Sequence, residues 1–194
     1  MKILAIRLKN LASLAGPFEI DFTAEPLASA GLFAITGPTG AGKSTLLDAL
    51  CLALFGAVPR LSNAQVSAKA PDADGEISTG DPRTLLRRGT GEGYAEVDFV
   101  GIDGRRYRAR WEANRAREKA AGKLQASRQS LRDIDLDQLL ASQKVDFKTQ
   151  LEAVLGLNFE QFTRAVLLAQ SEFSAFLKAN DNERSELLEK LTDT

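Results

Sequence analysis

The sequence predicts an α/β domain, and two neighbouring features near its N-terminus lead to that prediction. Residues 32–36 form a short apolar run bounded by glycines, which is typical of a strand buried on both faces of a sheet. Residues 43–55 follow with leucines at helical spacing, and Gly56 is suited to the C-terminal cap of a helix. A strand, a glycine-rich turn and a helix together make the basic unit of α/β folds.

Alternating patterns predict further strands. Residues 1–11 alternate with one fully apolar face, and residues 18–22 alternate apolar and acidic side chains, which predicts a hairpin of two strands. Residues 94–100 and 105–111 alternate on either side of Asp103-Gly104, a favoured two-residue turn.

The rest of the chain is less regular. Residues 57–93 hold three prolines and many glycines, and we expect a long surface excursion there. Helices are predicted at residues 145–155, stopped by Gly156, and at residues 159–168. A capping-box pattern predicts a last, highly charged helix at residues 181–191.

The composition excludes several functions. With 194 residues and a net charge of −1, the chain has room for one domain, and its overall charge favours no particular partner. It has no histidine, which excludes a histidine base and argues against zinc, and its single cysteine, Cys51, excludes an intrachain disulfide. We find no signal-peptide pattern and no apolar run long enough to span a bilayer, so we expect a cytoplasmic protein without a membrane partner.

Residues 37–44 read Gly-Pro-Thr-Gly-Ala-Gly-Lys-Ser and match the phosphate loop G-x-x-x-x-G-K-S in full, in the strand–loop–helix context it requires. Glycines let the backbone wrap a phosphate closely, and the helix start adds unpaired N–H groups. Lys43 would reach the β- and γ-phosphates of ATP, and the Ser44 hydroxyl would bind Mg²⁺. The predicted nucleotide-binding residues are Gly37, Pro38, Thr39, Gly40, Ala41, Gly42, Lys43, Ser44 and Thr45.

The phosphate loop alone does not distinguish a small-molecule kinase from a transporter ATPase or a DNA-repair ATPase. Hydrolysis needs an acidic residue at the end of an apolar strand to hold Mg²⁺. After the loop, no run of four apolar residues ends in Asp or Glu; the nearest match, Val97-Asp98, fits an amphipathic hairpin instead. This counts against a self-contained kinase and predicts that the acid is supplied by another part of the polypeptide.

Residues 168–177 resemble the Q-loop of the SbcC-type DNA-repair ATPases, whose pattern is roughly L-x-Q-x-x-F-x-x-F-L. The matching residues are Leu168, Gln170, Phe173, Phe176 and Leu177. Residues 6–13, 37–54 and 183–188 also resemble that family, and the resemblance is weakest between residues 64 and 79. Relatives often carry Asn where this chain has Thr39 and Arg where it has Ala12, which argues against a phosphate or ribose contact from position 12.

The resemblance implies the N-terminal lobe of a split ABC-type ATPase head at residues 1–180, followed by the start of a coiled-coil helix at residues 181–194. The implied fold is an α/β P-loop NTPase lobe with a β-hairpin or antiparallel subdomain beside a mixed sheet. In that family, the C-terminal lobe carries the Walker B acid, the signature motif and the catalytic glutamate. Gln170 would reach Mg²⁺ or the attacking water, and so would act as a second catalytic residue beside Lys43.

The same resemblance implies ATP and Mg²⁺ as cofactors. The implied partners are the chain's own C-terminal lobe, a second SbcC head in an ATP-dependent dimer, an SbcD-type nuclease and double-stranded DNA. The isolated lobe would be nearly inactive, and the protein would be cytoplasmic and nucleoid-associated. Alternatives are a chromosome-organising SMC-type ATPase without a nuclease partner, a self-contained small-molecule kinase, and a transporter ATPase with every motif in one domain.

Residues 105–132 hold ten basic residues against two acidic ones. Arg106, Arg108 and Arg110 fall on one face of the predicted strand, a row that suits sequence-independent phosphate contacts. Together with Arg115, they are candidate DNA-binding residues. The alternative is a solvated strand face that only keeps the domain soluble.

Overall fold

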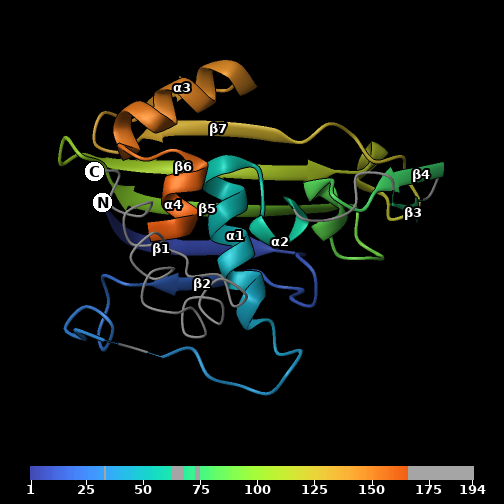
Figure 1. Ribbon diagram of the computed structural model, residues 1–194, viewed down its shortest axis with the longest axis horizontal. Coiled ribbons are helices and arrows are strands. Elements are labelled where there is room, and N and C mark those ends of the chain that lie inside the picture. The colour runs from blue at the N-terminus through green and yellow to red at the C-terminus, as the bar shows by residue number, and fades with distance from the viewer. Residues whose placement is uncertain (33, 63–67, 73–74, 166–194) are drawn as a thin grey trace, which may run out of the picture. The chain divides into compact units, whose positions relative to one another are not determined.

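The computed structural model describes residues 1–32, 34–62, 68–72 and 75–165. The chain divides into two compact units, residues 1–156 and residues 157–194, which we describe separately. The first unit is built on a six-stranded sheet in the spatial order β2-β1-β5-β6-β7-β8, in which all neighbouring strands are antiparallel (Figure 1). The strands of this sheet are β1 (Lys2–Lys9), β2 (Phe18–Asp21), β5 (Glu92–Val100), β6 (Arg106–Asn114), β7 (Arg128–Asp133) and β8 (Gln138–Ala141), and a separate hairpin is formed by β3 (Lys69–Asp72) and β4 (Gly75–Ser78).

Two helices cover one face of this sheet (Figure 1). Helix α1 (Lys43–Phe55) packs on β5, β6 and β1, and α3 (Lys144–Leu155) packs on β7 and β8. Both helices end at a glycine in the left-handed conformation, with φ of 62° at Gly56 and 74° at Gly156. The remaining elements are α2 (Pro59–Ser62), two 3₁₀ turns at Pro82–Leu85 and Ala116–Glu118, and, in the second unit, α4 (Phe159–Ala165).

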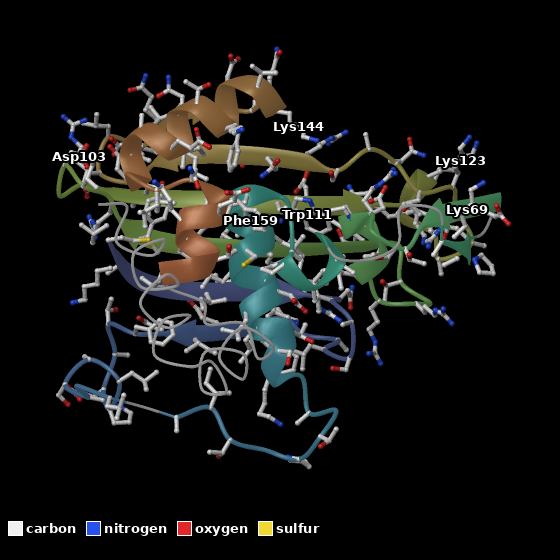
Figure 2. The ribbon with its side chains drawn as sticks, in the orientation of Figure 1. Lys69, Asp103, Trp111, Lys123, Lys144 and Phe159 are labelled. Carbon is white, nitrogen blue, oxygen red and sulfur yellow. The ribbon has the colours of Figure 1, made fainter. Side chains whose placement is uncertain are left out.

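The core lies between the two helices and the sheet. Alternate residues of β5, β6 and β7 point into it, and Trp111 lies next to α1 (Figure 2). Cys51 on α1 is 1% exposed, and burial raises the pKa of its thiol to about 12, so it serves as a packing residue. The core residues that are no more than 1% exposed include Val97, Phe99, Ala109, Trp111, Leu131, Leu52, Leu54 and Leu151.

The opposite face of the sheet carries a network of charges. Asp98 accepts hydrogen bonds from Arg7 Nη1 at 2.8 Å and from Arg108 Nε at 2.7 Å, and Glu96 accepts one from Arg110 Nη1 at 3.0 Å. The side chains of Glu96 and Asp98 are each only 10% exposed. Burial opposes ionisation of Asp98, but the hydrogen bonds from Arg108 and Arg7 outweigh it and hold the pKa of Asp98 below its usual value.

Most of the predicted local elements are confirmed. These are the N-terminal strand with its hairpin partner, the helix at 43–55 capped by Gly56, the strands around residue 103 and the helix stopped by Gly156. The turn between β5 and β6 is longer than the predicted two residues, since Gly101 N–H donates to Arg105 O at 2.9 Å across it. Residues 166–194, and with them the predicted helix at 181–191, lie outside the described residues.

The prediction of a buried strand at residues 32–36 is wrong. Its described residues are not in a strand, and Leu32 is 92% exposed and Ile35 46% exposed. A strand needs neighbours that satisfy its backbone groups, and no described strand pairs with this segment.

The prediction of a surface excursion at residues 57–93 is wrong in part. This segment contains α2, β3, β4 and a 3₁₀ turn, and Leu85 and Leu86 are only 7% and 5% exposed. Strands β7 and β8 were not predicted, because they are short and β7 is mostly polar; pairing with β6 defines them. In the described part of the chain, no helix combines the length and apolar character needed to cross a bilayer.

The charge network leads to a prediction about stability. Asp98→Asn should lower the free energy of unfolding by about 2 kcal/mol at pH 7, because it removes the charge from hydrogen bonds donated by Arg7 and Arg108. The pKa of Asp98 is depressed in the folded state, so its contribution is complete well above pH ~4, the pKa range of an unfolded aspartate, and is lost as pH falls through the lower folded value. Urea unfolding at pH 7 and at lower pH values measures the difference.

Asp137→Asn is the matched control. Asp137 pairs with Arg132 at 2.6 Å, but its side chain is 89% exposed, so we expect a loss below about 0.5 kcal/mol. Equal losses for the two variants, or a difference that does not change with pH, would contradict the role assigned to Asp98.

Candidate functional site

The phosphate loop (residues 37–45) precedes and opens α1. Three of its glycines have positive φ angles, 153° at Gly37, 84° at Gly40 and 94° at Gly42. Side chains rarely tolerate these conformations, and the loop needs them to fold its backbone around a small space. The glycine spacing therefore has a geometric reason.

The start of α1 is open to an anion. Gly42 is the N-cap residue, no side chain caps the helix, and no acidic residue lies in its first turn. Its first N–H groups and the positive end of the helix dipole therefore face a site where a phosphate oxygen could accept. Ser44 is exposed there, whereas Thr45 is 6% exposed.

The Lys43 ammonium lies within the loop. Its Nζ donates to Gly37 O at 2.7 Å and to Pro38 O at 2.8 Å, so the lysine folds back over the glycine-rich backbone. A triphosphate bound in the loop would replace these carbonyls as the acceptor of the lysine. Glycine backbone, open helix start, lysine and hydroxyl together fit ATP with Mg²⁺.

Carboxylates are scarce beside the loop. Asp48, one turn into α1, accepts a hydrogen bond from Arg60 Nε at 3.0 Å, and burial raises its pKa. Among the described residues, no group of three or more Asp, Glu, Cys or His side chains could hold a metal ion. Two Mg²⁺ ligands were predicted from the sequence. Ser44 lies in the described part of the chain, and Gln170 lies outside the described residues.

The four candidate DNA-binding arginines are all bonded within the fold. Arg106 Nε donates to Asp135 at 2.7 Å, and Arg108 belongs to the network around Asp98. Arg110 pairs with Glu96 and lies over the Tyr94 ring, 4.0 Å from its centre. Arg115 donates to Asp72 at 2.6 Å and to Gly122 O at 3.0 Å.

The predicted arginine row does exist as a geometric feature, since Arg106, Arg108 and Arg110 alternate with the buried Tyr107, Ala109 and Trp111 on β6. Each guanidinium nevertheless has a carboxylate partner from another part of the chain, so the row carries less free positive charge than the sequence suggests. Their contact with DNA stays a prediction.

Sequence reasoning missed one contributor to the site. The turn that follows β1 brings Leu14 against Gly42, so closely that a Cβ built on Gly42 would lie 2.6 Å from Leu14 Cδ2. Arg87 binds the main chain of the same turn. No local pattern marks these residues, since they come from three separate parts of the sequence.

Comparison with known proteins places this site in a family. The AAA domain family matches residues 5–194. Over its full length the chain is 72% identical to the C subunit of nuclease SbcCD from Pseudomonas aeruginosa and 57% identical to that from Rhodobacter capsulatus. Over 97% of its length it is 31% identical to a probable DNA double-strand break repair Rad50 ATPase of Aquifex aeolicus.

The chain spans about 16% of the length of each of these relatives. The matched region includes the glycine-rich loop, the open helix start and the antiparallel sheet on which that helix packs. The chain belongs to the AAA domain family, and over its full length it is similar to an N-terminal part of the SbcC subunits.

Proposed function

We propose that this chain is the ATP-binding part of an ATPase head that, completed by its own C-terminal lobe, hydrolyses ATP to control a partner nuclease. The nuclease would be of the SbcD type and would act on double-strand ends and hairpins of DNA. The observation that carries the proposal is the glycine loop at the uncapped start of α1, with Lys43 folded into it.

In this proposal, the loop holds the nucleotide through its own backbone and two side chains. The N–H groups at the start of α1 donate to phosphate oxygens, and Lys43 exchanges the carbonyls of Gly37 and Pro38 for the β- and γ-phosphates. Ser44 would hold Mg²⁺, which neutralises charge that develops on the phosphates. Gln170 would report the presence of the γ-phosphate to the rest of the head.

Exposed apolar side chains support completion by a second lobe. Leu32 and Ile35, just before the phosphate loop, are 92% and 46% exposed. Leu47, near the start of α1, is also 46% exposed. A lobe that contributed neighbouring strands would bury them and pair the segment at residues 32–36. The same lobe would bring the acidic residue that hydrolysis requires and that this sequence lacks.

Two such heads would bind two ATP molecules between them, each phosphate loop facing the signature motif of the other head. The relatives named as nuclease subunits favour a nuclease partner over the alternative of an SMC-type chromosome-organising ATPase. Copurification of the full-length protein with a metal-dependent phosphoesterase separates these two functions.

One prediction of this proposal concerns ATP hydrolysis. This polypeptide alone should hydrolyse ATP negligibly, and the complete head should turn ATP over. Lys43→Ala should reduce turnover of the complete head by roughly 10²–10³-fold, because it removes the positively charged ammonium that would contact the transferred phosphate. Steady-state phosphate release measures both effects.

Lys144→Ala is the matched control, since Lys144 is the first residue of α3 as Lys43 is of α1. It should leave turnover unchanged. Rapid hydrolysis by the isolated chain, or full activity of the Lys43→Ala head, would refute the proposal.

Another prediction of this proposal concerns DNA binding. Changing Arg106 and Arg108 together to Glu should weaken DNA binding by the complete head and reduce the salt dependence by about two phosphate contacts, a slope change of roughly 1.8. Fluorescence anisotropy with duplex DNA at several salt concentrations measures both quantities.

Because both arginines are ion-paired, the control removes their partners instead. Asp135→Asn and Asp98→Asn break the same pairs but leave the positive charges in place, so DNA binding should persist or tighten. If the reversed arginines leave affinity and slope unchanged, the row is not a DNA-binding surface.

A further inference from the structure

The turn after β1 has an unusual backbone. Asn10 and Ala12 have φ angles of 54° and 47°, in the left-handed region that residues with side chains seldom occupy. The turn is closed by hydrogen bonds from Asn10 N–H to Ala15 O at 3.0 Å and from Leu11 N–H to Leu14 O at 3.0 Å. Such a conformation persists only where surrounding contacts hold it.

The contacts that hold the turn come from residues 85–92. Ala12 N–H donates to Leu85 O at 2.8 Å, Arg87 N–H donates to Asn10 O at 2.9 Å, and the Asn10 side chain donates to Glu92 O at 2.9 Å. These bonds dock one side of the turn onto the segment that leads into β5.

The other side of the turn is held by the Arg87 side chain. Its Nη1 donates to Ser13 O at 2.7 Å and to Ala12 O at 3.1 Å. In the described part of the chain, no carboxylate pairs with this guanidinium. Its charge is therefore directed to two main-chain carbonyls, which a charged donor binds more strongly than a neutral one would.

Next to these carbonyls, Leu14 packs on the start of α1. A Cβ on Gly42 would lie 2.6 Å from Leu14 Cδ2 and 2.8 Å from Cγ, so the leucine occupies the space over the glycine. Gly42 is the N-cap, and its carbonyl accepts the first hydrogen bonds of the helix, from Thr45 N–H at 3.0 Å and Leu46 N–H at 3.3 Å. The position of Leu14 thus bears on the direction of the N–H groups that would meet a phosphate.

We infer that Arg87 is a positioning residue for nucleotide binding: it holds the turn at residues 11–14, and through Leu14 it holds Gly42 and the start of α1 in the phosphate-binding arrangement. This inference rests on the proposed function of the phosphate loop. Arg87 acts here through Leu14, so its effect belongs to binding and not to the chemical step.

The test is a double-mutant cycle in the full-length protein. Arg87→Ala and Leu14→Ala should each raise the Kd for Mg-ATP and the KM about tenfold, while kcat at saturating ATP changes less than about twofold. The double variant should bind Mg-ATP no more weakly than whichever single variant has the higher Kd, because both changes break the same chain of contacts. Isothermal calorimetry and steady-state hydrolysis provide these quantities.

Two further variants sharpen the result. Arg87→Lys keeps a charged donor and should recover part of the affinity, and it serves in place of Arg87→Ala if that variant does not fold. Arg132→Ala is the matched control, since Arg132 Nη1 donates to Asp137 O at 3.2 Å in a turn outside the phosphate loop and its contacts, and it should bind Mg-ATP as the parent protein does.

The outcomes separate this inference from the proposed function. If Lys43→Ala loses Mg-ATP binding but Arg87→Ala and Arg87→Lys bind like the parent protein, only the inference fails. If the losses from Arg87→Ala and Leu14→Ala multiply, Arg87 acts independently of Leu14 and the inference also fails. If the parent protein and Lys43→Ala bind Mg-ATP equally or not at all, the proposed function fails.

Discussion

The packing of α1 on the antiparallel sheet is the constraint on which the rest of the structure depends. The second half of this helix is buried, with Leu52 and Leu54 at 0% exposure against β5 and β6. At its start Ser44 is exposed, and Leu47, in the next turn, is 46% exposed. The C-terminal half of the helix is therefore anchored in the core. Its N-terminal end is left accessible, and unpaired N–H groups there can bind an anion.

The turn after β1 extends the same constraint to the phosphate loop. Leu14 touches Gly42, the turn is docked on residues 85–92, and those residues lead directly into β5, on which α1 packs. The start of α1 is thus positioned in two ways: the helix packs on β5, and Leu14 contacts Gly42 from a turn docked on the segment that leads into β5. Glycines at positions 37, 40 and 42 allow the backbone conformation of the loop. The turn that carries Leu14 contacts the end of this loop at Gly42.

The opposite face of the sheet shows why charge counted along a sequence differs from charge on a surface. Residues 105–132 are strongly basic as a segment. In the fold, Glu96 and Asp98 of the neighbouring strand meet Arg108 and Arg110, and burial of those carboxylates is tolerated because the guanidinium groups donate to them. These ion pairs follow from the register of β5 on β6, and that register cannot be obtained by counting charged residues in the sequence.

The sequence by itself determined the features that depend on neighbouring residues: the phosphate loop with Lys43 and Ser44, α1 with its cap at Gly56, and the β1–β2 and β5–β6 hairpins. Only the tertiary structure decided that Leu32 and residues 34–36 lie outside any strand, that the short polar β7 is a strand, and that Leu14 lies against Gly42 in a turn bound by Arg87. The reason is physical. Periodicity and turn chemistry act within a few residues, whereas strand pairing, ion pairs and the packing of a turn against a helix need partners distant in sequence.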